Sequence, residues 1–183
     1  AAREVADVLL DRHFDPVQGG LDTTADDAES LVVRRKDLLD GTGPSANSSA
    51  AVGLMRLAAI TGELRYANHA DRILQLLAAV VPEAPAATSN ALMAIELRQR
   101  GLVELVIPGE SPAMVAVAQT LWRPDLVLAW GERFDSPIWE GREDGRAYLC
   151  RDRVCQAPAT TAEQLFEQVT GRPLPDGVTL PES

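Results

Sequence analysis

A long polar segment between two helical patterns constrains this chain more than any other feature. Residues 15–45 show no helical spacing of apolar side chains. So long a connection without secondary structure is uncommon in a compact domain unless it binds a ligand or is disordered. The segment is dense in Asp, Gly, Asn and Ser, which favour specific turns. It is therefore a candidate binding loop, and its acids are candidate functional groups.

Helices are predicted on both sides of this segment. Ser45 or Asn47 can cap a helix, and Gly62 and Gly101 can supply left-handed helix ends. Short connections between the helices predict antiparallel hairpins. Apolar residues at helical spacing place the helices over residues 1–13, about 46–61, 64–81 and 87–100.

The pattern changes at Leu102. A β-branched run over 103–107, a helix beginning at Ser111 and an apolar run over 126–130 predict a right-handed parallel strand–helix–strand unit. A further strand at 147–150 is expected to pair with Val154 and Cys155, before a helix that opens at Thr160-Thr161-Ala162-Glu163. The sequence thus predicts a helical part over 1–101, a small α/β part over 102–171 and an extended tail over 172–183.

Charge and composition exclude several classes of partner. The net charge of −10 disfavours nucleic acid and anionic membranes, because both require clustered Lys and Arg. No apolar run is long enough to cross a membrane, and no signal-peptide pattern is visible, so we expect a cytoplasmic protein. The first helix lacks a capping residue before it, which predicts a chain cut out of something longer.

The acids of the polar segment are the candidate catalytic groups. Neighbouring carboxylates can have their pKa values driven apart, which creates a general acid and a base. We predict Asp26, Asp27 and Glu29 as catalytic residues. The alternative is a solvated acidic loop that caps helices and pairs with neighbouring basic residues. The predicted binding residues are Asp22, Arg34, Lys36, Asp40, Ser45 and Asn47.

Other candidate chemistry is weaker. His13 and His69 lack a third ligand at metal spacing, so we expect no metal site and no cofactor. Residues 41–45 lack the lysine of a phosphate-binding loop. Cys150 and Cys155 fit neither a CxxC pair nor a zinc half-site, so we expect two reduced thiols. A disulfide bridging a hairpin, or a redox pair, is the alternative.

Two separated motifs carry a resemblance to a known family. The first motif comprises Gly19, Gly20, Asp26, Asp27, Glu29, Arg34, Lys36, Asp37, Asp40, Gly41, Pro44, Ser45, Asn47 and Ser48. The second motif is the run from Ala147 to Pro158. Together they resemble the family of the spermatogenesis-associated protein 20 type, whose members join an N-terminal thioredoxin-like domain to a helical (α/α)6 toroid.

The resemblance implies a mainly α fold, in which antiparallel helical hairpins form part of the toroid and a small α/β unit with a βαβ motif follows. It implies a C-terminal fragment of such a protein, of unestablished activity. Toroids of this kind often act on sugars, so a small-molecule or carbohydrate ligand is expected. We expect the fragment to be inactive alone and to self-associate or pack on the missing N-terminal domains. The alternatives are a non-catalytic binding or assembly module, and a redox accessory using Cys150 and Cys155.

Overall fold

The fold is mixed α/β and divides into two compact units. The computed structural model describes residues 1–28, 33–151, 154–175, 177–178 and 180–181. Unit 1 consists of residues 1–58 and 63–99, and unit 2 consists of residues 59–62 and 100–183. Each unit has its own buried core and is described by itself.

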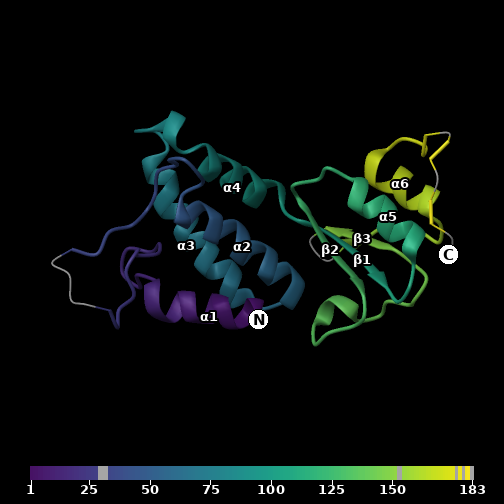
Figure 1. Ribbon diagram of the computed structural model, residues 1–183, viewed down its shortest axis with the longest axis horizontal. Helices are drawn as coiled ribbons and strands as arrows, with labels where there is room; N and C mark the ends of the chain where they lie inside the picture. The colour runs from purple at the N-terminus through teal and green to yellow at the C-terminus, as the bar shows by residue number, and fades with distance from the viewer. Residues whose placement is uncertain (29–32, 152–153, 176, 179, 182–183) are drawn as a thin grey trace. The chain divides into compact units, whose positions relative to one another are not determined.

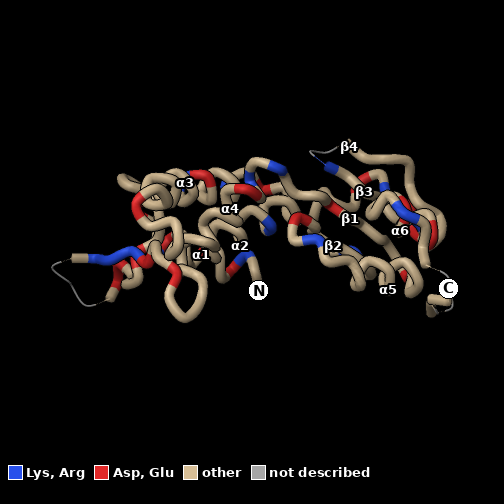
Figure 2. Tube along the Cα trace, turned by 90° about the horizontal axis from the view of Figure 1, so that it is seen from above, with Lys and Arg blue, Asp and Glu red and all other residues tan. Residues whose placement is uncertain are grey.

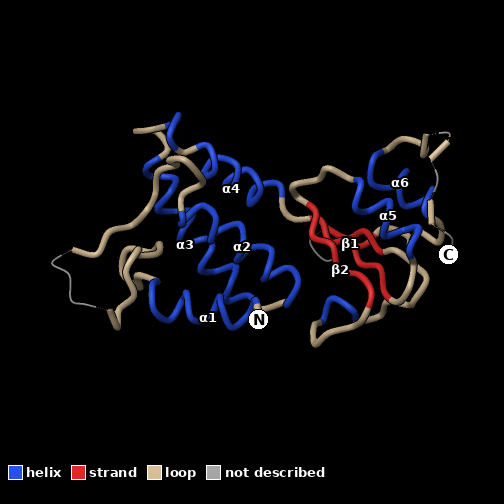
Figure 3. The backbone as a smooth tube through the Cα atoms, in the orientation of Figure 1, coloured by secondary structure: helices blue, strands red, loops and turns tan. Residues whose placement is uncertain are grey.

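Unit 1 is built from helices and the polar segment. The polar segment has no α-helix or strand among its described residues, and it joins the end of α1 to the start of α2 (Figure 3). Buried side chains from all four α-helices form the core, with Tyr66, Ile73 and Leu77 of α3 fully buried. The elements are α1 (Ala2–His13), α2 (Ala46–Thr61), α3 (Leu64–Val80), the short 3-10 helix η1 (Pro85–Ala87) and α4 (Ser89–Arg100) (Figure 1).

Unit 2 is a four-stranded sheet with two helices on one face. The strand order is β2-β1-β3-β4. β1 pairs with β2 in parallel, while β3 is antiparallel to both β1 and β4. The elements are β1 (Val103–Pro108), α5 (Pro112–Thr120), β2 (Leu126–Gly131), the 3-10 helix η2 (Pro137–Trp139), β3 (Tyr148–Arg151), β4 (Val154–Cys155) and α6 (Ala162–Thr170) (Figure 1).

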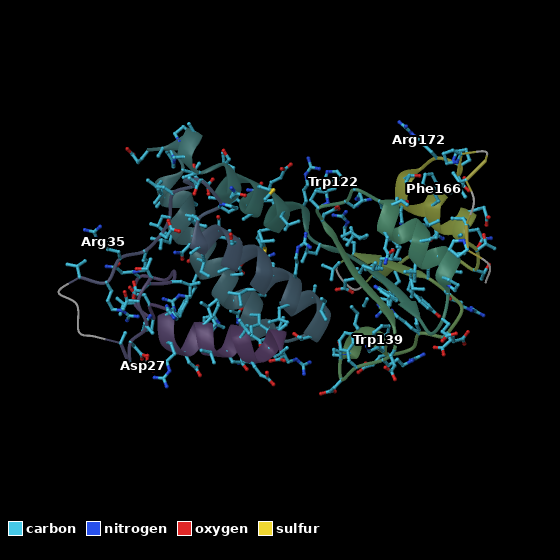
Figure 4. All side chains as sticks on the ribbon, in the orientation of Figure 1. Asp27, Arg35, Trp122, Trp139, Phe166 and Arg172 are labelled. Atoms are coloured by element: carbon cyan, nitrogen blue, oxygen red, sulfur yellow. A yellow bond between two sulfur atoms is a disulfide. The ribbon has the colours of Figure 1, made fainter. Side chains whose placement is uncertain are left out.

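Alternation along β1 separates the two faces of this sheet, because successive strand residues point to opposite sides. Leu105 and Ile107 pack against α5 and α6 in the larger core. Val106 faces the other side, where it packs with Trp139 of η2, Tyr148 and Cys150. Phe166 of α6, labelled in Figure 4, packs at the edge of the larger core. The cysteine therefore lies on the face opposite the helices.

The prediction of a partial helical toroid is wrong. The described residues show a mixed fold of helices and a four-stranded sheet, with no toroid of helical hairpins. The physical reason is that a toroid requires a closed ring of helical hairpins. Here the chain changes at Val103 from helices to strands whose side chains are buried on both faces. The strand–helix–strand unit expected after Leu102 is present as β1, α5 and β2.

The cap of α6 lies one residue later than expected, because the Thr161 hydroxyl accepts from the Gln164 amide and the Gln164 side chain accepts from the Thr160 amide.

Among the described residues, no helix has the length and apolar character needed to cross a membrane.

Candidate functional site

The polar segment of unit 1 is folded tightly against the ends of α1 and α2. Isolated bridges pair Phe14 with Leu21 and Asp22 with Lys36. Gly19 and Gly20 have φ values of 75° and 78°, in the left-handed region that favours glycine. A Cβ atom on Gly19 would lie 2.9 Å from the Arg72 carbonyl oxygen in α3. The turn between α1 and Leu21 therefore packs against α3 at backbone distance.

Asn47 in the first turn of α2 joins two stretches of this segment, around Leu21 and Asp37. Its Oδ1 accepts from the Leu21 amide at 2.7 Å, and its Nδ2 donates to the Leu21 carbonyl at 3.0 Å. Nδ2 also donates to the Asp37 carbonyl at 2.9 Å. The side chain is fully buried. The Asn47 side chain thus satisfies backbone groups of residues 21 and 37 that a neighbouring strand would satisfy in a sheet.

A network of ion pairs lies beside this amide. Lys36 Nζ contacts Asp15 Oδ2 at 2.7 Å and Asp22 Oδ1 at 3.5 Å. The guanidinium of Arg34 lies 3.3 Å from Asp22 Oδ2 and donates to the Thr24 carbonyl at 2.6 Å. The basic run forms one blue stretch with red acidic residues beside it in Figure 2. Asp22 is only 7% exposed, so its charge is balanced by two cations away from bulk water.

The predicted catalytic acids are paired with α1. Arg12 Nη1 lies 3.4 Å from Asp26 Oδ1 and 3.4 Å from Asp27 Oδ2. The Arg12 carbonyl oxygen accepts hydrogen bonds from both the Asp26 amide and Arg34 Nη2. Asp26 and Arg34 therefore share one acceptor. Asp27 and Arg35 lie at the outer edge of the segment in Figure 4. The third predicted acid, Glu29, falls outside the described residues.

Asp40 and Ser45 hold the starts of two helices. Asp40 accepts from the Ser45 amide and from the Asn90 amide, each at 2.9 Å, and so joins the start of α2 to the start of α4. The Asn90 amide and then the Ser45 amide lower the pKa of Asp40 below its ordinary value. Ser45 Oγ accepts from the Ser48 amide at 3.1 Å, which is the capping role expected of it.

These contacts favour the alternative considered for the segment, in which the acids cap helices and pair with cations. A general acid at neutral pH needs a raised pKa. Among the described residues of the segment, Asp15 and Asp40 are the carboxyl groups with shifted pKa values, and both pKa values are shifted downward. A catalytic role for Asp26, Asp27 and Glu29 stays a prediction, since the contacts of the first two are ion pairs at the protein surface.

Acid should weaken unit 1 through Asp15. Lys36, then the amides of Gln18 and Val17, lower the pKa of this carboxyl to about 2. Because the folded pKa is depressed, the stabilisation is complete above about pH 4 and is lost as the pH falls toward about 2. Urea unfolding at a series of pH values should show this loss in the native protein and a flatter profile in Asp15→Asn.

The exposed Asp11 provides the matched control, since Asp11→Asn makes the same change without these partners. The native pH profile should persist in Asp11→Asn. If Asp15→Asn and the native chain gave parallel profiles, the ion pair with Lys36 would contribute nothing in solution.

The two cysteines lie elsewhere, at the edge of the sheet in unit 2. We expected reduced thiols, but Cys150 and Cys155 are joined by a disulfide. The physical reason is the register of β3 and β4, which places these two residues directly opposite each other. The number of residues between cysteines does not reveal such pairing, because it depends on where the turn falls. The hairpin-bridging alternative is the one that the structure contains.

Sequence reasoning missed the cation beside these sulfurs. Arg142 Nη2 lies 3.2 Å from Cys150 Sγ and 3.8 Å from Cys155 Sγ. Burial lowers the pKa of the Arg142 guanidinium from its ordinary value, and the negative charge of Glu104 opposes that effect. Arg142 belongs to the loop before β3, and no spacing in the sequence links it to either cysteine. The residue pair and its cation therefore form a second candidate site.

Comparison with known proteins places this chain beside longer relatives. No protein-family model matches it. It is 28% identical over 168 residues to spermatogenesis-associated protein 20 of Homo sapiens, covering 82% of this chain and 21% of that protein. The Mus musculus protein of that name is 26% identical over 164 residues, covering 80% and 21%. The chain spans about a fifth of the length of these curated relatives. Over most of its length, the chain is homologous to a region of spermatogenesis-associated protein 20.

Proposed function

We propose that unit 2 carries a thiol–disulfide exchange site at Cys150 and Cys155. The observation that carries this proposal is the contact of Arg142 with both sulfur atoms. A neighbouring guanidinium lowers the pKa of a thiol and stabilises the thiolate, which is the form that reacts. A disulfide whose only role is to stiffen a hairpin needs no such cation.

The two cysteines differ in access. Cys150 is 1% exposed, whereas Cys155 is exposed. An incoming thiolate therefore reaches Cys155 Sγ first. This asymmetry assigns Cys155 to the mixed disulfide and Cys150 to the buried position of the resolving thiol.

The reductant in this exchange is a dithiol. One thiolate of the dithiol attacks Cys155 Sγ, the bond between the cysteine sulfurs breaks, and its electron pair remains on Cys150 as a thiolate facing Arg142. The second thiol of the dithiol, once deprotonated, attacks its own sulfur in the mixed disulfide and releases Cys155. The protein gains two electrons, the dithiol is oxidised to a disulfide, and the protons of the dithiol pass to solvent or to the released thiolates.

Replacing Arg142 should slow this reaction. In Arg142→Met we expect the thiol pKa to rise and the rate of reduction by dithiothreitol to fall about tenfold, because the leaving thiolate loses its cation. The rate is measured by quenching the reduction with an alkylating reagent at a series of times and quantifying the alkylated protein by mass spectrometry. The pH dependence of alkylation in the reduced protein gives the thiol pKa values, which a purely structural role would leave unchanged.

Arg146→Met is the matched control, since Arg146 is paired with Glu143 near the surface. It should keep the native rate and pH profile. Equal rates in Arg142→Met and Arg146→Met would contradict the proposal. So would a disulfide that stays oxidised in glutathione buffers poised at about −300 mV, where structural disulfides persist.

A further inference from the structure

A cavity in unit 2 lies where the two parallel strands end. Its volume is about 1060 Å³, and it is lined by residues that follow β1 and β2 together with the exposed side of α5. Crevices outside the carboxyl ends of parallel strands are the usual ligand sites of α/β sheets. One wall is apolar and comes from Pro112, Val115 and Ala116. The cavity therefore offers an apolar surface in a position typical of a binding site.

Two carboxylates are held at the rim by backbone geometry. The amide of Gly109 donates to the Gly131 carbonyl at 3.2 Å, which brings the turns after β1 and β2 together. Both glycines have positive φ values, 70° and 81°. Glu110 and Glu132 follow these glycines directly, and both line the cavity. Both glutamates therefore line the same cavity, each directly after one of the two bridged glycines.

Neither glutamate has an ion pair or hydrogen bond with the residues that the structure describes. The cation nearest to them in sequence is already engaged. Arg133 donates to Asp144 Oδ1 at 2.7 Å and to the Arg142 carbonyl at 2.8 Å. The charge of Arg133 is therefore balanced by Asp144. The cavity keeps the negative charge of the two glutamates.

Trp130 adds an aromatic surface to the same cavity. It is in register with Ile107, whose side chain belongs to the core beneath α5 and α6, so the indole lies on the helix side of the sheet. The side chain is 52% exposed although it follows four strand residues that are mostly buried. An exposed indole beside carboxylates attracts cations through its electron-rich face.

We propose that this cavity binds an organic ammonium ion, with the charged nitrogen between Glu110 and Glu132 and its apolar part against Trp130 and the wall of α5. A divalent metal fits less well, because the described residues contain no group of three metal-ligating side chains at a suitable spacing. The site is independent of the cysteines: Cys150 pairs with Glu104 near the start of β1, whereas the cavity lies beyond its end.

The test is a nuclear magnetic resonance titration of the whole chain with benzyltrimethylammonium chloride. We expect the indole N–H signal of Trp130 to shift and saturate, while the signal of the 91% exposed Trp122, which lies outside the cavity, stays in place. Benzyl alcohol, a neutral probe with the same ring, should bind at least about tenfold more weakly. Raising sodium chloride from about 20 to about 200 mM should weaken the binding of benzyltrimethylammonium but not that of benzyl alcohol.

Variants assign the charge to the two glutamates. Glu110→Gln with Glu132→Gln should weaken benzyltrimethylammonium binding about tenfold, whereas Glu167→Gln, on the exposed side of α6, should leave it unchanged. Equal binding of the neutral probe, or equal shifts of Trp122 and Trp130, would overturn the proposal. Saturable shifts of the same signals with millimolar magnesium chloride would also overturn it, in favour of a metal site. The salt dependence decides the question on the native chain if the double variant does not fold.

Discussion

Replacing Asn47 with alanine is expected to destabilise unit 1 by about 3 to 5 kcal/mol. The change removes three hydrogen bonds and leaves the buried amide and carbonyl of Leu21 without their partners. Each buried polar group left unsatisfied costs about 1 to 3 kcal/mol, more than the net gain from making the bond. The measurement is urea unfolding followed by far-ultraviolet circular dichroism, which reports the helices.

Asn68→Ala is the control, because it makes the same chemical change at an exposed position of α3. Its midpoint should stay within about 0.5 kcal/mol of the native value, since alanine is the better helix former. The three tryptophans all lie in unit 2, so their fluorescence follows that unit separately. If Asn47→Ala and Asn68→Ala unfolded together, Asn47 would not be the residue that holds the polar segment in place.

The second large effect is expected at Gly19. Gly19→Ala introduces a Cβ atom 2.9 Å from the backbone oxygen of Arg72, which cannot move without shifting α3. The left-handed backbone conformation adds about 1 to 2 kcal/mol for a residue with a side chain. We expect a total loss of about 3 kcal/mol from conformation and overpacking together. Urea unfolding by circular dichroism measures it.

Gly43→Ala tests the same substitution where space is open. No atom lies within 4 Å of the added Cβ, and the backbone is not left-handed. The substitution should be neutral, or stabilise by up to about 1 kcal/mol through the unfolded chain. Similar losses at Gly19 and Gly43 would show that contact with α3 is not what makes the first position intolerant.

Local patterns predicted the elements because each carries its own signal. The expected helix over 46–61 has the bounds of α2, where Ser45 provides the cap. The helix expected over 87–100 begins later, at Ser89, because the prolyl residue before it forms the separate turn η1. Short β-branched runs predicted β1 and β2, and their parallel pairing followed from the helix between them.

Local patterns could not show whether the helices form part of a toroid. Amphipathic spacing shows that a helix buries one face, but it does not show what covers that face or how many helices close a ring. The family resemblance supplied that number, and the sheet of unit 2 contradicts it. Homology to spermatogenesis-associated protein 20 stands without the toroid, since it rests on the aligned residues alone.

The polar segment shows what residue types reveal and what they hide. A dense set of acids and bases indicated ion pairs, and Asp22 with Arg34 and Lys36 forms them. The partner of Asp26 is Arg12, which the linear sequence leaves among the helical residues. Asn47 was expected to bind or cap. Its bonds to Leu21 depend on a chain reversal that composition does not encode.

The bridge between β3 and β4 closes a very small ring of chain. The two cysteines are separated by five positions, so the chain entropy that the bond removes from the unfolded state amounts to only about 2 kcal/mol. The larger core of unit 2, between the sheet and its two helices, contains neither cysteine. Opening the bond should therefore leave the protein folded, and heat should unfold unit 2 of the reduced form about 8 to 16 °C below that of the oxidised form.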